Sequence, residues 1–259
     1  MNRMPAVAGS FYPANADQLR QQVHAYLIRA HSGTRVPKAL IAPHAGLVYS
    51  GAIAASAYAR LEPAFDTINR VVLLGPSHRV AFKGLALTQA DYYVTPLGAI
   101  PIDHTIEPIL ADLPYVGILE HAHTHEHSLE LQLPFLQQQL ASFSLIPIVT
   151  GDATPEQIST VLERLWGGPE TLIVISSDLS HYHNYETAQK LDKATSIAIE
   201  KLQYERLDYE SACGRVPING LLKLARDKNL TVKTIDLSNS GDTGGDKRRV
   251  VGYGAYVID

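Results

Sequence analysis

The stretch RVVLLGPSHR, from Arg70 to Arg79, decides the fold class of this chain. Its aliphatic run, residues 71–74, is too short for a helix and is rich in strand formers. Such a run is typical of a strand buried on both faces, as in a parallel sheet covered by helices. Gly75-Pro76 ends the run, and Ser77-His78 then supplies the first large polar side chains. The sequence therefore predicts a buried strand that delivers polar groups at its carboxyl end.

Three further apolar runs lead into polar residues in the same way: 39–42 into 43–46, 172–175 into 176–181, and 234–237 into 238–242. Ligands bind outside the carboxyl ends of the strands in open α/β sheets, so the four loops predict one site. Short, turn-separated strand patterns over residues 83–102 predict a hairpin region. We expect a single α/β domain over residues 1–259. Its mostly parallel central sheet is flanked by helices and carries a short hairpin insertion.

Composition narrows the function classes. The 259 residues are 46% hydrophobic and 19% charged, an ordinary profile for a soluble globular protein. The net charge of -4 gives no electrostatic footprint for nucleic acid. A single cysteine, Cys213, excludes an internal disulfide and fits a reducing compartment. The chain has no secretion signal and no apolar run of about 18 residues, so we expect a cytoplasmic protein that does not engage membranes.

Two histidines follow predicted strands, each a few residues beyond the end of its strand. His44 comes two residues after the apolar run 39–42, and His78 comes two residues after the Gly75-Pro76 pair that ends the run 71–74. A single loop histidine usually bonds backbone groups, but two imidazoles at one sheet edge suit iron, zinc or copper.

Asp242 is the expected third ligand, because it lies in a Ser-Gly-Asp loop after another strand. Two histidines and one carboxylate form the facial triad of non-haem Fe(II) oxygenases, although the same set also suits catalytic zinc. The alternative for Asp242 is an Asx-type turn.

The segment 177–181 predicts acid–base chemistry. Histidine is a common general acid or base in enzymes, so His181 is the candidate for that role, with Asp178 orienting it. A Ser-His-Asp hydrolase competes with this interpretation, but no Gly-x-Ser-x-Gly elbow is present. The purely structural alternative is a helix start capped by Ser177 or Asp178.

Histidines alternate over residues 121–127, and we interpret this segment as a surface loop leading into a helix. We expect at least one of His125, Glu126 and His127 to reach the site and to support the ligands from behind. Cys213 is interpreted as a small buried residue rather than a nucleophile.

Several motifs occur in a familiar order: PHAG at 43–46, GPSH at 75–78, EHSLE at 126–130, SSD at 176–178 with His181, CGR at 213–215 and SGD at 240–242. With this set the chain resembles the MEMO family over almost its whole length, in the prokaryotic branch named AmmeMemoRadiSam system protein B. The resemblance implies a fold similar to class III extradiol dioxygenases, the non-haem iron enzymes that open catechol rings. It also implies His44 and His78 as metal ligands and His181 as the acid–base histidine, with Asp178 beside it.

The animal relatives place a cysteine at the third ligand position, where we expect Asp242. A carboxylate favours harder metals than a thiolate does, and argues against copper–thiolate chemistry.

The expected function is therefore metal-dependent oxidation by a metalloprotein with dioxygenase-like architecture. Fe(II) is the expected metal, with zinc or copper as alternatives, and Ser77, Glu126 and His127 are expected near ligands or substrate. The substrate, a small molecule or peptide, is unknown. The rival is a binding module that keeps the pocket without turnover, because animal relatives are linked to phosphotyrosine-peptide binding; metal-assisted hydrolysis is a third option. The family name also implies a link to a radical-SAM protein and an AMMECR-type protein.

Overall fold

A computed structural model describes residues 1–33 and 35–259. The first half of the chain forms β1 (Asn2–Arg3), α1 (Ala16–Leu27), β2 (Ala39–Ala42), α2 (Leu47–Tyr58), η1 (Ala59–Ala64), β3 (Arg70–Pro76), β4 (Leu85–Leu87), β5 (Tyr92–Thr95), β6 (Gly98–Pro101), η2 (His104–Ile106), α3 (Glu107–Leu110) and β7 (Val116–Ile118). The second half forms α4 (Glu120–Thr124), η3 (Glu130–Gln132), α5 (Leu133–Gln139), β8 (Ser144–Thr150), α6 (Pro155–Arg164), β9 (Thr171–Ser176), β10 (His181–His183), α7 (Tyr185–Glu200), η4 (Tyr204–Arg206), α8 (Arg215–Asp227), β11 (Val232–Asn239) and β12 (Val250–Ile258).

The main sheet confirms the predicted mostly parallel core. Among the described residues it has nine strands in the order β10-β12-β2-β9-β3-β8-β4-β7, with β11 also paired to β12. The central strands β2, β9, β3 and β8 run parallel to one another. The strand β12 is antiparallel to β2, β10 and β11. The carboxyl ends of the central strands therefore meet at one edge of the sheet.

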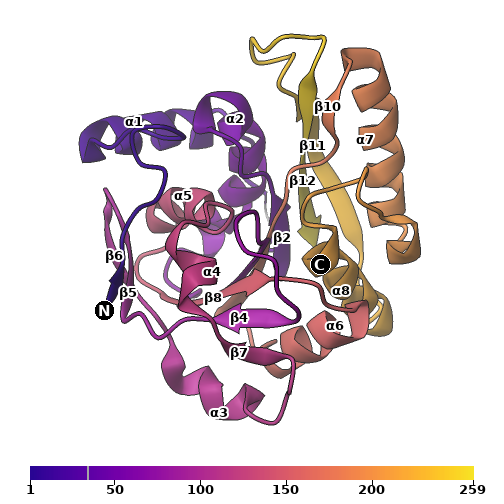
Figure 1. The fold of residues 1–259 in the computed structure, drawn as a ribbon. Coiled ribbons are helices and arrows are strands. Elements are labelled where there is room, and N and C mark those ends of the chain that lie inside the picture. Colours follow the sequence, from indigo (N-terminus) through magenta and orange to yellow (C-terminus); the bar gives the residue numbers. More distant parts are fainter. Residues whose placement is uncertain (34) are drawn as a thin grey trace.

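Helices cover both faces of this sheet (Figure 1). Alternate residues of β3 show why: Val71 and Leu73 belong to the apolar cluster with α1, α2 and α5, whereas Val72 and Leu74 belong to the cluster with α6 and α8. Successive side chains of a strand point to opposite faces, so a strand covered on both faces must be apolar throughout. The aliphatic run of residues 71–74 therefore lies in the buried core of the molecule.

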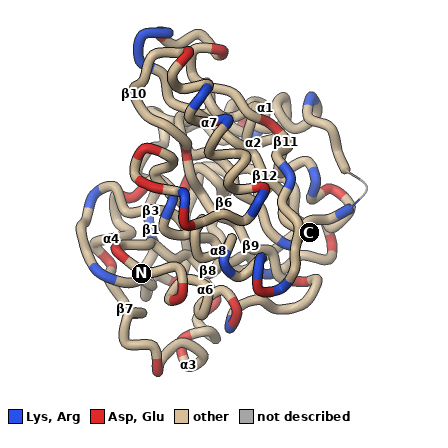
Figure 2. The backbone as a smooth tube through the Cα atoms, turned by 90° about the vertical axis from the view of Figure 1, so that its right-hand side faces the viewer, with Lys and Arg blue, Asp and Glu red and all other residues tan. Residues whose placement is uncertain are grey.

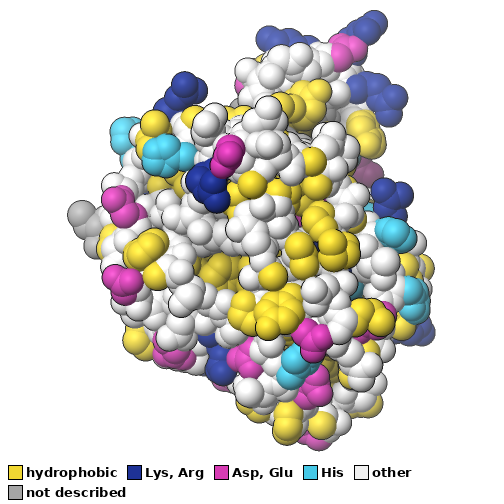
Figure 3. All heavy atoms as spheres, turned by 90° about the vertical axis from the view of Figure 1, so that its left-hand side faces the viewer, with side chains coloured by type: hydrophobic (Ala, Val, Ile, Leu, Met, Phe, Trp, Pro, Cys, Tyr) yellow, Lys and Arg dark blue, Asp and Glu magenta, His cyan; other side chains and the backbone are white. Residues whose placement is uncertain are grey.

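The predicted hairpin is formed by β5 and β6, which pair antiparallel and join β1 in a small sheet of their own. The first strand of the same region, β4, instead extends the main sheet, antiparallel to β8. Figure 3 shows the face that α1 and this hairpin form, with hydrophobic side chains in its middle and charges of both signs around them. None of the helices in the described part of the chain is both long and apolar enough to cross a membrane.

The histidine-rich segment differs from the predicted surface loop. Residues 120–124 form the short helix α4, and His123 is fully buried. Its Nε2 lies 2.9 Å from the carbonyl oxygen of Ala86 and its Nδ1 lies 2.7 Å from the hydroxyl of Tyr93. A carbonyl only accepts hydrogen bonds, so Nε2 carries the proton and Nδ1 accepts from the tyrosine. The ring is thus held neutral in the core.

A buried ion pair ties the amino-terminal segment to the same region. The Arg3 guanidinium pairs with Glu130, and both side chains are almost completely buried. Arg3 also donates to the backbone carbonyls of His123 and Glu126. The Glu130 carboxylate further accepts from the Tyr12 hydroxyl and from backbone N–H groups of residues 6 and 7. Each buried charge is therefore compensated from several directions, as burial requires.

Replacing Arg3 with methionine should lower the free energy of unfolding by about 3–5 kcal/mol, because Glu130 would keep a buried charge without its partner. Denaturant unfolding monitored by circular dichroism measures this loss. The exposed pair of Arg20 and Asp17 provides the control. Arg20→Met should cost about 1 kcal/mol or less. Equal effects of the two substitutions would contradict the importance of the Arg3 pair.

His123 makes stability depend on pH. Burial lowers the pKa of His123 from 6.5 to about 4, so the unfolded chain binds a proton between these values and the folded chain does not. The stabilisation is complete above pH 6.5 and is lost as the pH falls toward 4, an effect of about 3 kcal/mol. The wild type should therefore lose about that much more stability than His123→Gln between pH 7 and pH 4, measured by denaturant unfolding. Parallel losses in the two proteins would show that this ring is not responsible.

Candidate metal centre

The four predicted loops reach one cavity, the 238–242 loop through Ser240. The strand β2 leads into His44, β3 leads into His78, and β9 leads into Asp178. The centroids of the two imidazole rings lie 5.2 Å apart, with an interplanar angle of 77°. All three residues line one cavity of about 670 Å³.

The tautomer of His44 follows from its surroundings. Its Nδ1 lies 2.8 Å from the hydroxyl oxygen of Ser176. That hydroxyl donates its only proton to the carbonyl of Ser128, at 2.6 Å, so it can only accept from His44. Nδ1 therefore carries the proton, and Nε2 presents a lone pair. Burial, together with the nearby His78 and His127, lowers the pKa of His44 well below its usual value and keeps the ring neutral.

His78 is oriented in the same sense by a carboxylate. Its Nδ1 donates to Glu126 Oε1 at 2.9 Å, and its backbone N–H donates to Oε2 at 2.6 Å. Although burial alone would raise it, these hydrogen bonds hold the pKa of Glu126 at about 2. A carboxylate that accepts from the far nitrogen of a histidine is a common support for a metal ligand. The Nε2 of His78 is left with a free lone pair.

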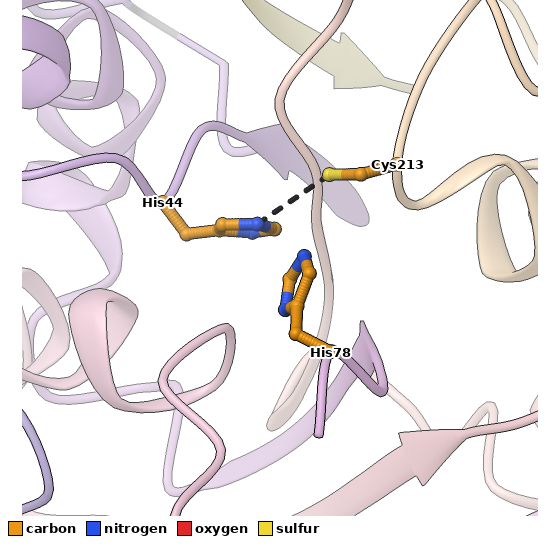
Figure 4. A group of neighbouring side chains, drawn as sticks. All are labelled: His44, His78 and Cys213. Carbon is orange, nitrogen blue, oxygen red and sulfur yellow. Dashed lines mark hydrogen bonds between the residues drawn. The ribbon is translucent and has the colours of Figure 1, made fainter. Parts of the chain in front are cut away.

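Cys213 lies beside the two histidines and is the third potential metal ligand of this group (Figure 4). Its sulfur lies 3.4 Å from His44 Nε2. One ligand atom from each of His44, His78 and Cys213 lies within 4.8 Å of the other two. Burial and the nearby Asp178 raise the pKa of the thiol, so without a cation the sulfur is protonated.

Gly214 allows this approach of the cysteine loop. A Cβ atom at this position would lie 2.6 Å from the Ser177 Cβ and 2.8 Å from the backbone oxygen of Ser176. Such distances are closer than packed atoms tolerate. The loop before α8 can therefore lie against the end of β9 only because residue 214 lacks a side chain.

His127 lies beside the group formed by His44, His78 and Cys213. Its ring stacks on His78 with centroids 4.6 Å apart, and its buried Nδ1 has no hydrogen-bond partner among the described residues. Nδ1 lies 3.4 Å from Glu126 Oε1. His78 therefore also belongs to a second set of neighbouring ligand atoms, which it forms with Glu126 and His127.

Asp178 and His181 lie in the same cavity but are held separately. The Asp178 carboxylate accepts from the backbone N–H groups of His44 and Ala45 at 2.8 and 3.3 Å. The His181 ring instead donates from Nδ1 to the carbonyl of Leu179 at 2.8 Å. The structure therefore differs from the expectation that Asp178 orients His181, because a carbonyl has that role. The Nε2 of His181 is free to accept a proton.

The structure does not bring Asp242 to the two histidines. Its carboxylate accepts from the Tyr185 hydroxyl, the Ser238 hydroxyl and the Asn239 backbone N–H, at 2.6, 2.9 and 3.1 Å. It lines a different hollow, beside α7. The reason is topological: β11, which precedes it, pairs with β12, and β12 separates β11 from β2. Its carboxylate does not form the alternative Asx-type turn either: the Asx contact in this loop belongs to Asn239, whose Oδ1 accepts from the Gly241 N–H at 2.9 Å. Cys213 takes the place in the group expected for Asp242.

Ser77 shapes the turn after β3. Its hydroxyl donates to the carbonyl of Val80 at 2.6 Å, and it faces a smaller cavity that also contains Cys213. Of the residues expected to support the ligands, Glu126 has the most direct contact, since it bonds to His78 twice.

Cys213 is the residue that the sequence interpretation missed. It lies before a helix and not after a strand, so the pattern that identified His44 and His78 does not include it. The available signal was its place in the CGR motif that contributes to the family resemblance. Gln132, which donates to Ser176 Oγ at 2.7 Å and supports the His44 contact, was also missed, because nothing in its local sequence distinguishes it.

Comparisons with known proteins agree with the resemblance. The family model described as "Memo-like protein" matches residues 3–257. A "MEMO1 family protein" of Aquifex aeolicus is 37% identical over 97% of both chains, and one of Sulfolobus acidocaldarius is 34% identical over 98% of both chains.

A crystal structure of an uncharacterized protein from Escherichia coli K12 superposes with a TM-score of 0.58 at 12% identity. It covers 86% of this chain and all of that one, and it supports the fold alone. The likeness to extradiol dioxygenases stays a prediction. The matched motifs, the α/β architecture and full-length relatives establish that this chain belongs to the Memo family.

Proposed function

We propose that the protein binds one transition-metal ion through His44 Nε2, His78 Nε2 and Cys213 Sγ. The observation that carries the proposal is that one ligand atom from each of the three residues lies within 4.8 Å of the other two. Two fixed tautomers support it, because both imidazoles present a lone pair on Nε2. Neutral imidazole and thiolate are the ligands that transition metals take from proteins.

The donor set suits several metals. Fe(II), the metal expected from the resemblance, takes imidazole ligands, and a thiolate moves the preference toward zinc and copper relative to a carboxylate. Three protein ligands leave a coordination position open, as in catalytic sites. His78 is the most exposed of the three, and the position would open toward the large cavity.

For the reaction at this metal site, we propose metal-dependent oxidation of a small molecule or peptide. The metal would supply Lewis acidity and redox capacity. His181 would move a proton through its free Nε2, and Asp178 would hold the His44 loop through backbone hydrogen bonds. The exposed aromatic residues Tyr49 and Tyr182 line the cavity and suit an organic ligand. A binding module without turnover would use the same cavity. The link to a radical-SAM protein and an AMMECR-type protein stays a prediction.

Metal analysis tests the ligand set. Protein produced with iron, zinc and copper supplements should contain about one metal ion per chain, and His44→Ala, His78→Ala and Cys213→Ser should each lose most of it, because three protein ligands are needed to hold the ion. Asp242→Asn is the matched control and should keep the wild-type content. Mass spectrometry of the metals gives the stoichiometry, and circular dichroism checks that each variant is folded.

Absence of metal from the wild type would contradict the proposal. So would metal loss in Asp242→Asn together with full retention in Cys213→Ser, since that result would favour the carboxylate set.

Oxygen dependence tests the reaction class. Iron-loaded protein should consume dioxygen in the presence of at least one member of a panel of catechols, measured with an oxygen electrode. His181→Ala should slow consumption by about 10²–10⁴-fold at unchanged metal content, because it removes the proton-transfer group. Turnover that continues without dioxygen would favour hydrolysis, and ligand binding without turnover would favour the binding module.

A further inference from the structure

A basic cavity lies at the end of the sheet opposite the metal centre. It has a volume of about 300 Å³ and is lined by Arg35, Pro37, Arg60, Lys233, Ile235, Val257 and Asp259. Pro37 precedes β2, whereas His44 follows it, so β2 separates the two sites. Lys233 and Val257 are opposite each other in the β11–β12 pair and form one wall. We call this hollow the basic cavity.

Three cations share this cavity with one carboxylate side chain. Among the described residues that line it, Arg35, Arg60 and Lys233 lie with Asp259, which here carries a main-chain carboxylate beside that of its side chain, in a chain whose net charge is -4. Within the described residues, no carboxylate lies at ion-pairing distance from any of the three, although ion pairs occur elsewhere on the molecule. In Figure 2, several Lys and Arg segments lie around the marked C-terminus. Converging like charges repel one another, so a bound anion would relieve the repulsion.

The guanidinium of Arg60 gives a second indication that this cavity binds a ligand. Its Nε is buried and has no hydrogen-bond partner among the described residues. Buried donors in folded proteins are almost always paired, and an unpaired one calls for an explanation such as a ligand. Gly33 lies against the same guanidinium, because a Cβ at that position would come within 2.6 Å of Arg60 Nη1. The backbone at Gly33 thus contacts the guanidinium of an arginine that also lines the basic cavity.

We propose that the basic cavity binds a phosphoryl group, through Arg60, Arg35 and Lys233. A tetrahedral dianion matches a set of guanidinium and ammonium donors. The volume exceeds that of a free phosphate, and Pro37, Ile235 and Val257 offer apolar contact to a short carbon skeleton. The ligand is either inorganic phosphate or the phosphate of a small ester. The site is independent of the metal centre.

Calorimetric titration at constant ionic strength tests this site, with inorganic phosphate and glycerol 3-phosphate as probes and glycerol and acetate as controls. Both phosphate compounds should bind saturably, and tighter binding of one of them identifies the source of the phosphoryl group. Arg60→Met and Lys233→Met should each weaken binding about tenfold, because each removes a charge-assisted hydrogen bond. Lys190→Met and Lys201→Met remove exposed charges from the region of α7 and should bind like the wild type.

Two further variants locate the binding. Arg79→Met alters a cation of the large cavity that His44 and His78 line, and Cys213→Ser removes a proposed metal ligand; both should bind phosphate normally. Loss of binding in Arg79→Met would move the anion to the other cavity and overturn the proposal. It would also be overturned if neither probe bound at about 10 mM, a weak-affinity limit, or if Arg60→Met and Lys233→Met both bound like the α7 controls. Lys233→Met changes an exposed residue and serves if Arg60→Met does not fold.

Discussion

The hydrogen-bonded register of the parallel strands β2, β9 and β3 is the constraint on which the site depends. Ala42 lies opposite Ser176, and Leu74 of β3 lies opposite Ile175 of β9. Because the strands are parallel and in this register, the chain leaves all three at the same edge of the sheet. The imidazole of His44 can then reach Ser176 of the neighbouring strand, and that contact fixes which nitrogen carries its proton.

One segment supplies most of the support behind the histidines. Glu126, Ser128, Glu130 and Gln132 are all polar and almost completely buried. Glu126 holds His78, the carbonyl of Ser128 takes the Ser176 proton, and Gln132 donates to Ser176. Glu130 ties the segment to Arg3 at the amino terminus. Burying so many polar groups is costly unless each has a partner, so this segment has little freedom to move. The site is therefore preorganised by the buried polar residues that support the two histidines.

The fold and the two histidines could be predicted because their signals are local. A short apolar run followed by a polar side chain identifies His44 and His78 from a few residues each. The third ligand depends on relations that no local pattern contains. Asp242 follows a strand, as expected, but β12 lies between that strand and β2. Cys213 precedes a helix and reaches the group only because Gly214 lets its loop lie against β9. Strand order and loop packing are set by the whole chain, so the sequence pattern selected the wrong neighbour for the histidines.

The central claim is that two imidazole nitrogens and one thiolate sulfur meet at a single ion. X-ray absorption spectroscopy of the zinc-loaded protein tests it most directly, because sulfur and nitrogen scatter differently and lie at different distances. We predict one sulfur at about 2.3 Å together with nitrogen ligands at about 2.0–2.1 Å. A first shell made only of nitrogen and oxygen would contradict the assignment of Cys213 and the account of the site built on it.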